Sequence, residues 1–218
     1  LIRQSPDVAG FEIPGVNRPV KVRLFADDTV LYLKATDRYD VVLQITRKWC
    51  AVSGAKFNEE KTEIIPIGSQ AHRKKVIETR RLNDQDSILA ASIKIAQDGH
   101  PVRSLGSWIG NKVDDAEPWA PIIDKISAEL DRWGKGKPTL LAKKLIIQMV
   151  VGGRTQYLTK VQGMPQHIEN ILIKKIREFI WEGKAVPPLA IEYLYLPKDE
   201  GGIGLLDLKA RNEAIHIT

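Results

Sequence analysis

Two adjacent aspartates, Asp27 and Asp28, are the residues of this chain whose type and spacing best suit chemistry. Adjacent carboxylates repel each other, so a pair of them needs a reason to stand together. One reason is binding of Mg²⁺ or Mn²⁺, which prefer hard oxygen ligands. Carboxylates that hold such ions over the attacking and leaving oxygens catalyse nucleotidyl transfer. An Asp-Asp pair also suits an ordinary solvated turn, so these two residues alone leave both interpretations open.

Two strand-like segments flank the aspartates. Residues 20–24 alternate between apolar and basic side chains, and residues 29–33 are rich in β-branched, aromatic and aliphatic side chains. Both patterns are typical of β-strands. The sequence therefore predicts a β-hairpin whose tip presents Asp27 and Asp28.

Helix and strand signals alternate after this hairpin. A helix is predicted over residues 39–52, with Asp37 as its N-cap. A strand is predicted over residues 63–68, and the polar stretch 69–85 fits either an exposed helix or a loop. The tetrapeptide Asp-Gly-His-Pro at 98–101 predicts a hairpin turn. Its strands are expected at residues 92–96 and 102–110.

The pattern becomes helical after residue 111, because apolar residues recur every three or four positions. Three helices are predicted, at residues 119–133, 139–151 and 165–181. Residues 193–197 have the composition of a strand. The sequence therefore predicts an α+β chain that is mixed up to about residue 112 and mostly helical beyond it.

Positive charge is concentrated rather than spread. The net charge is +6, yet no Asp or Glu occurs from Arg132 to Ile168. Such a window attracts phosphate backbones, although a solvated helix face is the alternative interpretation. A second basic cluster at residues 73–81 is diluted by nearby acids. The acid-free window carries Arg132, Lys135, Lys137, Lys143, Lys144, Arg154 and Lys160.

Composition excludes several classes of protein. The hydrophobic fraction is 43%, and no apolar run is long enough to span a membrane, so no membrane partner is expected. The single cysteine, Cys50, allows no internal disulfide and fits a reducing compartment. The absence of a secretion signal predicts an intracellular protein of the cytoplasm or nucleus. Because Leu1 begins in mid-pattern, we interpret the chain as a fragment of a longer reading frame.

Five segments occur in this order along the chain: residues 25–32 (FADDTVLY), 53–63 (SGAKFNEEKTE), 104–110 (SLGSWIG), 179–184 (FIWEGK) and 196–204 (LPKDEGGIG). Together they resemble the C-terminal part of a non-LTR (LINE-type) retrotransposon reverse transcriptase. In that family the first segment is similar to motif C of the palm, the second to the lysine-bearing loop after it, and the third to the hairpin that steadies the primer end. The last two lie in and beyond the thumb.

The resemblance implies a division of the chain and an activity. Residues 1–112 would be the C-terminal part of a polymerase palm, an antiparallel sheet with helices that includes the primer-grip-like hairpin. Residues 113–182 would be a mostly helical thumb, and residues 183–218 a C-terminal extension. The activity implied is RNA-directed DNA synthesis, with an RNA template, a DNA primer and deoxynucleoside triphosphates as partners.

The resemblance also implies roles for residues. Asp27 and Asp28 would be catalytic and would ligate Mg²⁺ or Mn²⁺, and Lys61 would lie near the incoming nucleotide unless it is only a surface lysine. The basic window would follow the template–primer backbone. Trp133 and Tyr157 would be candidates to stack on nucleic acid, but Trp133 lies on an apolar stripe and is expected in the core. Core positions are also expected for Trp119, Phe179 and Trp181.

The family pattern is incomplete in this sequence. Reverse transcriptases carry a further catalytic aspartate in an upstream palm motif, and Asp7 precedes a glycine turn rather than lying on a strand. The fragment is therefore expected to be inactive by itself and to work only in its intact parent. Two alternatives stay open: a non-catalytic nucleic-acid-binding remnant of a retroelement, or a domain that only docks a partner.

Overall fold

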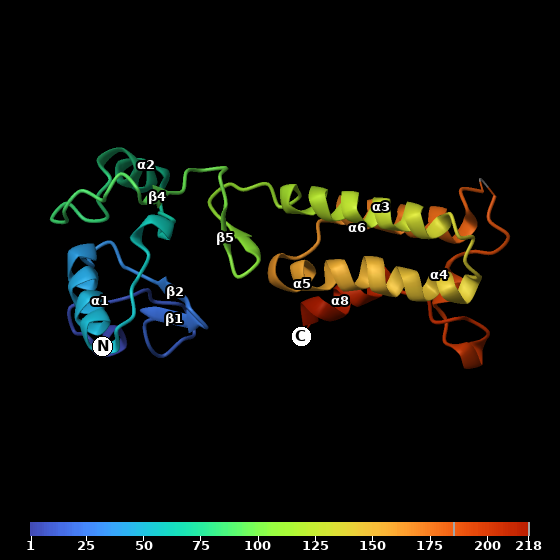
Figure 1. Cartoon of the computed structure of the whole chain (residues 1–218), viewed down its shortest axis with the longest axis horizontal. Helices are drawn as coiled ribbons and strands as arrows, with labels where there is room; N and C mark the ends of the chain where they lie inside the picture. The colour runs from blue at the N-terminus through green and yellow to red at the C-terminus, as the bar shows by residue number, and fades with distance from the viewer. Residues whose placement is uncertain (185, 218) are drawn as a thin grey trace. The chain divides into compact units, whose positions relative to one another are not determined.

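The computed structural model describes residues 1–184 and 186–217, except for the side chain of Glu59. The chain is α+β and divides into two compact units, residues 1–102 and 103–218, which are described separately below. Figure 1 traces both units from blue to red along the sequence.

The first unit combines short strands with two α-helices. Strands β1 and β2 pair antiparallel, while β3 and β4 pair in parallel across the connection that contains α2. A crossover of this kind is what parallel pairing requires. The elements are η1 (Ile2–Gln4), β1 (Val22–Phe25), β2 (Asp28–Leu31), α1 (Tyr39–Ser53), η2 (Glu59–Lys61), β3 (Glu63–Ile64), α2 (Gln70–Thr79) and β4 (Lys94–Ile95).

Two buried aspartates hold the loops of this unit. The Asp37 carboxylate accepts hydrogen bonds from the backbone N–H groups of Ala9, Gly10 and Lys34, at 2.6, 2.9 and 2.8 Å. Asp86 instead accepts from the N–H of Tyr39, the first residue of α1, at 3.0 Å. The prediction that Asp37 caps this helix is wrong. A carboxylate distant in sequence satisfies the helix terminus, leaving Asp37 free to join the segment at Ala9 and Gly10 to the turn at Lys34.

The predicted hairpin at residues 98–101 is also wrong. Gly99 makes a turn with φ 82°, but the strands on either side of it belong to different sheets. Strand β5 (Val102–Ser104) pairs with β6 (Ser107–Ile109) across Leu105 and Gly106. Both of these loop residues have positive φ, 48° and 81°, the conformation that two-residue hairpins favour.

The second unit is mainly helical, and α4 and α5 run end to end through a π-helical turn (Figure 1). Residues 193–197, predicted as a strand, contain the short helix α7 instead, because Leu194 turns inward to the helical core. After β6 the elements are η3 (Glu117–Trp119), α3 (Ala120–Gly134), α4 (Leu140–Ile147), η4 (the π turn, Gln148–Gly152), α5 (Gly153–Gln162), α6 (Gln166–Trp181), α7 (Glu192–Tyr195), η5 (Lys198–Glu200) and α8 (Leu208–Ile217).

One apolar core joins these helices. Trp119 is fully buried in it, and Phe179 and Trp181 pack against it, which confirms the prediction for all three aromatic residues. Trp133 is 41% exposed and lies outside the cluster, so its predicted core position is wrong. Its ring lies 5.9 Å from the Arg132 guanidinium, which covers it instead.

The last helix, α8, docks onto the π turn through polar contacts. A π turn leaves a backbone carbonyl without its usual helical partner. Arg211 donates to the carbonyl oxygen of Gly152 at 3.1 Å, and burial lowers the pKa of this guanidinium. The neighbouring Asn212 donates to the buried carboxylate of Glu169 at 2.7 Å. These bonds join the π turn, α6 and α8 without leaving the carboxylate unpaired.

The division between the units falls near the β5–β6 hairpin. The boundary predicted at residue 112, where the sequence pattern becomes helical, assigned this hairpin to the first part of the chain. In the structure most of the hairpin belongs to the second unit. Two contacts explain the difference: the Tyr157 hydroxyl donates to the carbonyl oxygen of Leu105, and the Trp108 N–H donates to Gln162 at 3.0 Å. Both partners lie on α5, which therefore holds the hairpin.

Candidate functional site

The β1–β2 hairpin presents the two aspartates as predicted. Phe25 pairs with Asp28 at the end of the ladder, so Ala26 and Asp27 alone form the connecting loop. Ala26 takes a positive φ of 51°, which the tight loop requires of its first residue. Both aspartates are exposed, and in the described part of the chain neither side chain forms a hydrogen bond or ion pair.

The tip of this hairpin combines carboxylates with exposed apolar side chains. Leu24 is 63% exposed and Phe25 is 66% exposed. Phe25 and Asp28 are cross-strand partners and so project from the same face. The tip is therefore an open surface on which both carboxylates are accessible.

The tip of the hairpin offers a divalent ion the carboxylate oxygens of Asp27 and Asp28. Two carboxylates are ligands of the right chemistry for Mg²⁺ or Mn²⁺. Among the described residues, however, no group of three His, Cys, Asp or Glu side chains is placed to hold a metal ion. The described residues alone do not make a complete metal site, and we derive no catalytic step through an ion.

Lys61 is exposed at the end of η2. The backbone N–H of Lys61 donates to the side-chain oxygen of Asn58 at 3.2 Å, so the Asn58 side chain shapes this turn. Within the described residues the Lys61 ammonium group forms no ion pair with Asp27 or Asp28, so its assignment to a nucleotide stays a prediction.

The seven cations of the acid-free window fall into two groups. Lys143 is buried: its ammonium group donates to the carbonyl oxygen of Ile180 at 2.9 Å and to Glu182 at 2.8 Å. The hydrogen bond from Lys143 lowers the pKa of the Glu182 carboxyl below its usual value. Arg154 pairs with Glu129. The cations that form no ion pair with another described residue are Arg132, Lys135, Lys137, Lys144 and Lys160.

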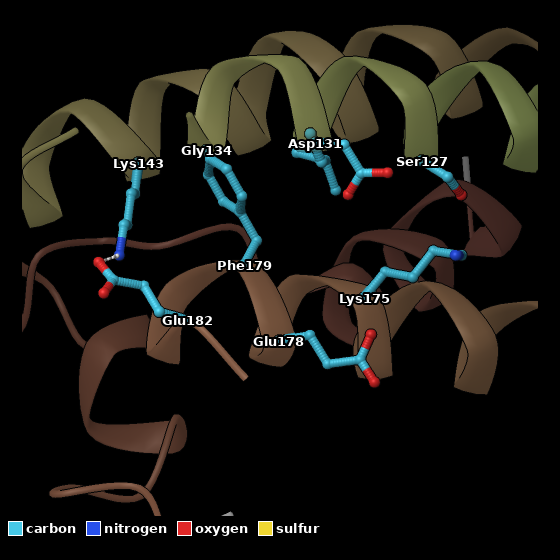
Figure 2. A pocket seen from close by; sticks show the side chains of 9 residues that line it. Ser127, Asp131, Gly134, Lys143, Lys175, Glu178, Phe179 and Glu182 are labelled. Carbon is cyan, nitrogen blue, oxygen red and sulfur yellow. Dashed lines mark hydrogen bonds and ion pairs between the residues drawn. The ribbon is translucent and has the colours of Figure 1, made fainter. Parts of the chain in front are cut away.

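Figure 2 shows Lys143 reaching down from α4 to Glu182, at the C-terminal end of α6. The two residues border a pocket of about 350 Å³ among α3, α4 and α6, where Phe179 lies beside Gly134. This placement does not agree with a role for Lys143 in contacting nucleic acid. We therefore leave Lys143 out of the proposed surface.

The second basic cluster is occupied by internal contacts. Arg73 forms a bidentate salt bridge with Asp98, with both hydrogen bonds at 2.8 Å. This pairing raises the pKa of the Arg73 guanidinium. Arg80 donates to the carbonyl oxygens of Leu89, Ala90 and Ile93. Lys75 pairs with Asp84 at 2.7 Å. These side chains hold the chain around α2, which favours the structural interpretation of the cluster.

The contact between the β5–β6 hairpin and α5 was not predicted from the sequence. A Cβ at Gly106 would lie 2.9 Å from Cε1 of Tyr157, so only glycine allows the tyrosine ring this close. The Leu105-Gly106 pair between two short strand-like segments was a signal for the hairpin itself, because glycine is typical of a two-residue hairpin loop.

A search against models of known protein families finds no match for this chain. In the described residues, no helix is both long and apolar enough to cross a membrane.

Proposed function

We propose that this chain is the palm and thumb part of an RNA-directed DNA polymerase of the retrotransposon type. The observation that carries the proposal is the two-residue hairpin loop, which exposes Asp27 and Asp28 together at its tip. A pair of accessible, unpaired carboxylates is suited to binding divalent ions, which stabilise the oxygens of a phosphoryl group in transfer. The order of the five family-like segments supports the same assignment.

The proposal applies to the intact parent protein. Among the described residues no third acidic, thiol or imidazole side chain joins the aspartates in a metal-binding group. A working centre would need a further carboxylate supplied from outside residues 1–218. In that centre Asp27 and Asp28 would each offer oxygen ligands, and Mg²⁺ or Mn²⁺ would supply the Lewis acidity.

The test is primer extension on an RNA template by the complete reading frame that contains this chain. Asp27→Asn keeps the size of the side chain and removes its charge, so DNA synthesis should fall by at least about a hundredfold. Asp7→Asn, at another exposed aspartate of the same unit, should leave synthesis unchanged. Retained synthesis in the Asp27→Asn protein would show that the hairpin is only a solvated turn.

A second candidate function is nucleic-acid binding without catalysis. The observation that favours it is the set of five unpaired cations in a window with no acidic residue. Such a surface would hold a duplex through its phosphates, without reading the sequence of bases.

Lys135 and Lys137 are exposed between α3 and α4, so they can be changed without entering the core. Lys135→Glu combined with Lys137→Glu should weaken binding of the chain to an RNA–DNA duplex and reduce its salt dependence. Lys74→Glu combined with Lys75→Glu is the matched control, because Lys74 and Lys75 already pair with Glu78 and Asp84. Equal losses in both double variants would contradict a specific surface.

A further inference from the structure

A row of exposed apolar side chains runs along the α4–α5 helix. Its members are four residues apart, with Gly153 at the one position that lacks a side chain, and their exposed fractions lie between 40% and 64%. The opposite face of the same helix builds the core of the unit. The helix is thus apolar on two faces. The core explains one of them, and the β5–β6 hairpin contacts the other at Tyr157, so among the described residues Leu141, Leu145 and Met149 remain without an internal partner that explains them. The members of this row, called the α4–α5 apolar row, are Leu141, Leu145, Met149, Tyr157 and Val161.

The π turn keeps these side chains on one side. In a regular α-helix of 3.6 residues per turn, residues four apart drift steadily around the axis. The π turn at Gln148–Gly152 takes more residues in one turn, which offsets part of that drift. From residue 141 to residue 161 the row is about 30 Å long. A long, narrow apolar ridge of residues four apart is the surface that another helix packs against.

Charge decides what kind of helix fits. No acidic residue occurs on α4 or α5, and Lys144 and Lys160 flank the row without an ion pair among the described residues. A second copy of this chain would bring the same cations against each other. A partner with carboxylates beside its apolar face would complement them.

We propose that the α4–α5 apolar row docks an amphipathic α-helix of another protein, apolar at every fourth residue and flanked by Glu or Asp. This interaction goes beyond the proposed function and does not depend on it. Burial of half-exposed leucine and methionine side chains against an apolar partner surface is favourable because it removes them from water. The phosphates of a nucleic acid offer no such apolar surface. A contiguous exposed apolar patch also marks interaction sites on soluble proteins.

The test uses a fluorescein-labelled synthetic helix of about 20 residues, long enough to cover the row. Its leucines recur every fourth residue and are flanked by glutamates; a second peptide carries lysines in place of the glutamates. Binding to the 218-residue chain is followed by fluorescence anisotropy. The glutamate peptide should bind at least about tenfold more tightly than the lysine peptide.

Leu145→Gln should weaken binding of the glutamate peptide by about tenfold, because Leu145 is the most exposed member of the row. Ile171→Gln, at an exposed apolar position of α6, is the matched control and should leave the affinity unchanged. Circular dichroism checks that both variants keep their helices. Equal affinity of the two peptides, or unchanged binding by the Leu145→Gln chain, would overturn the proposal.

Duplex binding measured on the same variants separates this proposal from the nucleic-acid surface. Leu145→Gln should leave RNA–DNA duplex affinity unchanged. If it weakens duplex binding and not peptide binding, the α4–α5 apolar row belongs to nucleic acid, and the protein-docking proposal fails.

Discussion

Lys143 and Lys144 are neighbours with the same charge and opposite surroundings. Consecutive residues of a helix point about 100° apart, so Lys143 enters the core side of α4 while Lys144 stays half-exposed. The ammonium group of Lys143 lies at the C-terminal end of α6, where backbone carbonyls carry partial negative charge. Its contribution is therefore structural: it satisfies a buried carbonyl and the Glu182 carboxylate.

Lys143→Ala should lower the free energy of unfolding by about 1–3 kcal/mol, because the buried carbonyl of Ile180 loses its donor. Lys144→Ala is the adjacent control and should change it by no more than about 0.5 kcal/mol. Urea denaturation followed by circular dichroism measures both. Equal effects of the two substitutions would contradict the distinct surroundings of the two lysines.

The β5–β6 hairpin packs against helix α5 within the second unit. Tyr157 and Gln162 each bond to the hairpin backbone, and Gly106 allows the tyrosine ring to approach. Arg103 lies 6.0 Å from the ring of Trp108, which adds a cation–π contact within the hairpin. A hairpin this short is only marginally stable alone, so its order depends on α5.

Tyr157→Phe should loosen the hairpin without unfolding the helices. Loss of one hydrogen bond worth about 1 kcal/mol corresponds to about fivefold faster amide exchange at residues 103–109. Hydrogen exchange with mass spectrometry measures this, and peptides from α3 and α6 should keep their protection. Tyr193→Phe, at an exposed tyrosine of α7, is the control and should change neither region.

The elements that the sequence predicted well have strong local signals. The β1–β2 hairpin and the helices α1, α3 and α6 have long periodic patterns or a clear turn between strands. The sequence missed what depends on distant partners. The cap that Asp86 provides for α1, the parallel pairing of β3 with β4, and the burial of Lys143 all join segments remote in sequence. Local periodicity carries no signal for such contacts.

For the candidate site, the same reasoning located both aspartates at an exposed hairpin tip, because alternation and turn chemistry fix that geometry locally. It did not separate the free cations of the basic window from the paired ones. Lys143 and Arg154 each lie beside a carboxylate distant in sequence, Glu182 and Glu129, and the local sequence carries no signal for either pairing. Fold class, α+β, follows from composition and periodicity, whereas pairing between segments does not.

At the scale of the whole molecule, the chain contains two separately packed units. The large apolar cluster lies entirely in the second unit. The first unit instead buries individual apolar side chains such as Val8, Val42 and Val76, together with Asp37 and Asp86. Separate cores allow separate unfolding.

We therefore expect two transitions when the chain is unfolded with urea. Asp86→Ala removes the cap of α1 and should shift only the transition of the first unit, by about 1 kcal/mol. Lys143→Ala should shift only the other transition. Intrinsic tryptophan fluorescence and circular dichroism, recorded on the same samples, distinguish the two unfolding transitions. One transition moved by both substitutions would show that the units unfold together.

The docking of α8 sets an order for biosynthesis. A ribosome delivers residues 119–181 before Leu205 and Leu208, which complete the buried cluster, and before Arg211 and Asn212. Domains fold as their residues emerge, the N-terminal ones first. A nascent chain that stalls before residue 205 therefore carries residues 1–102 of the first unit and a helical unit whose core is open. Such stalled chains present the apolar surface that chaperones and quality-control proteases recognise.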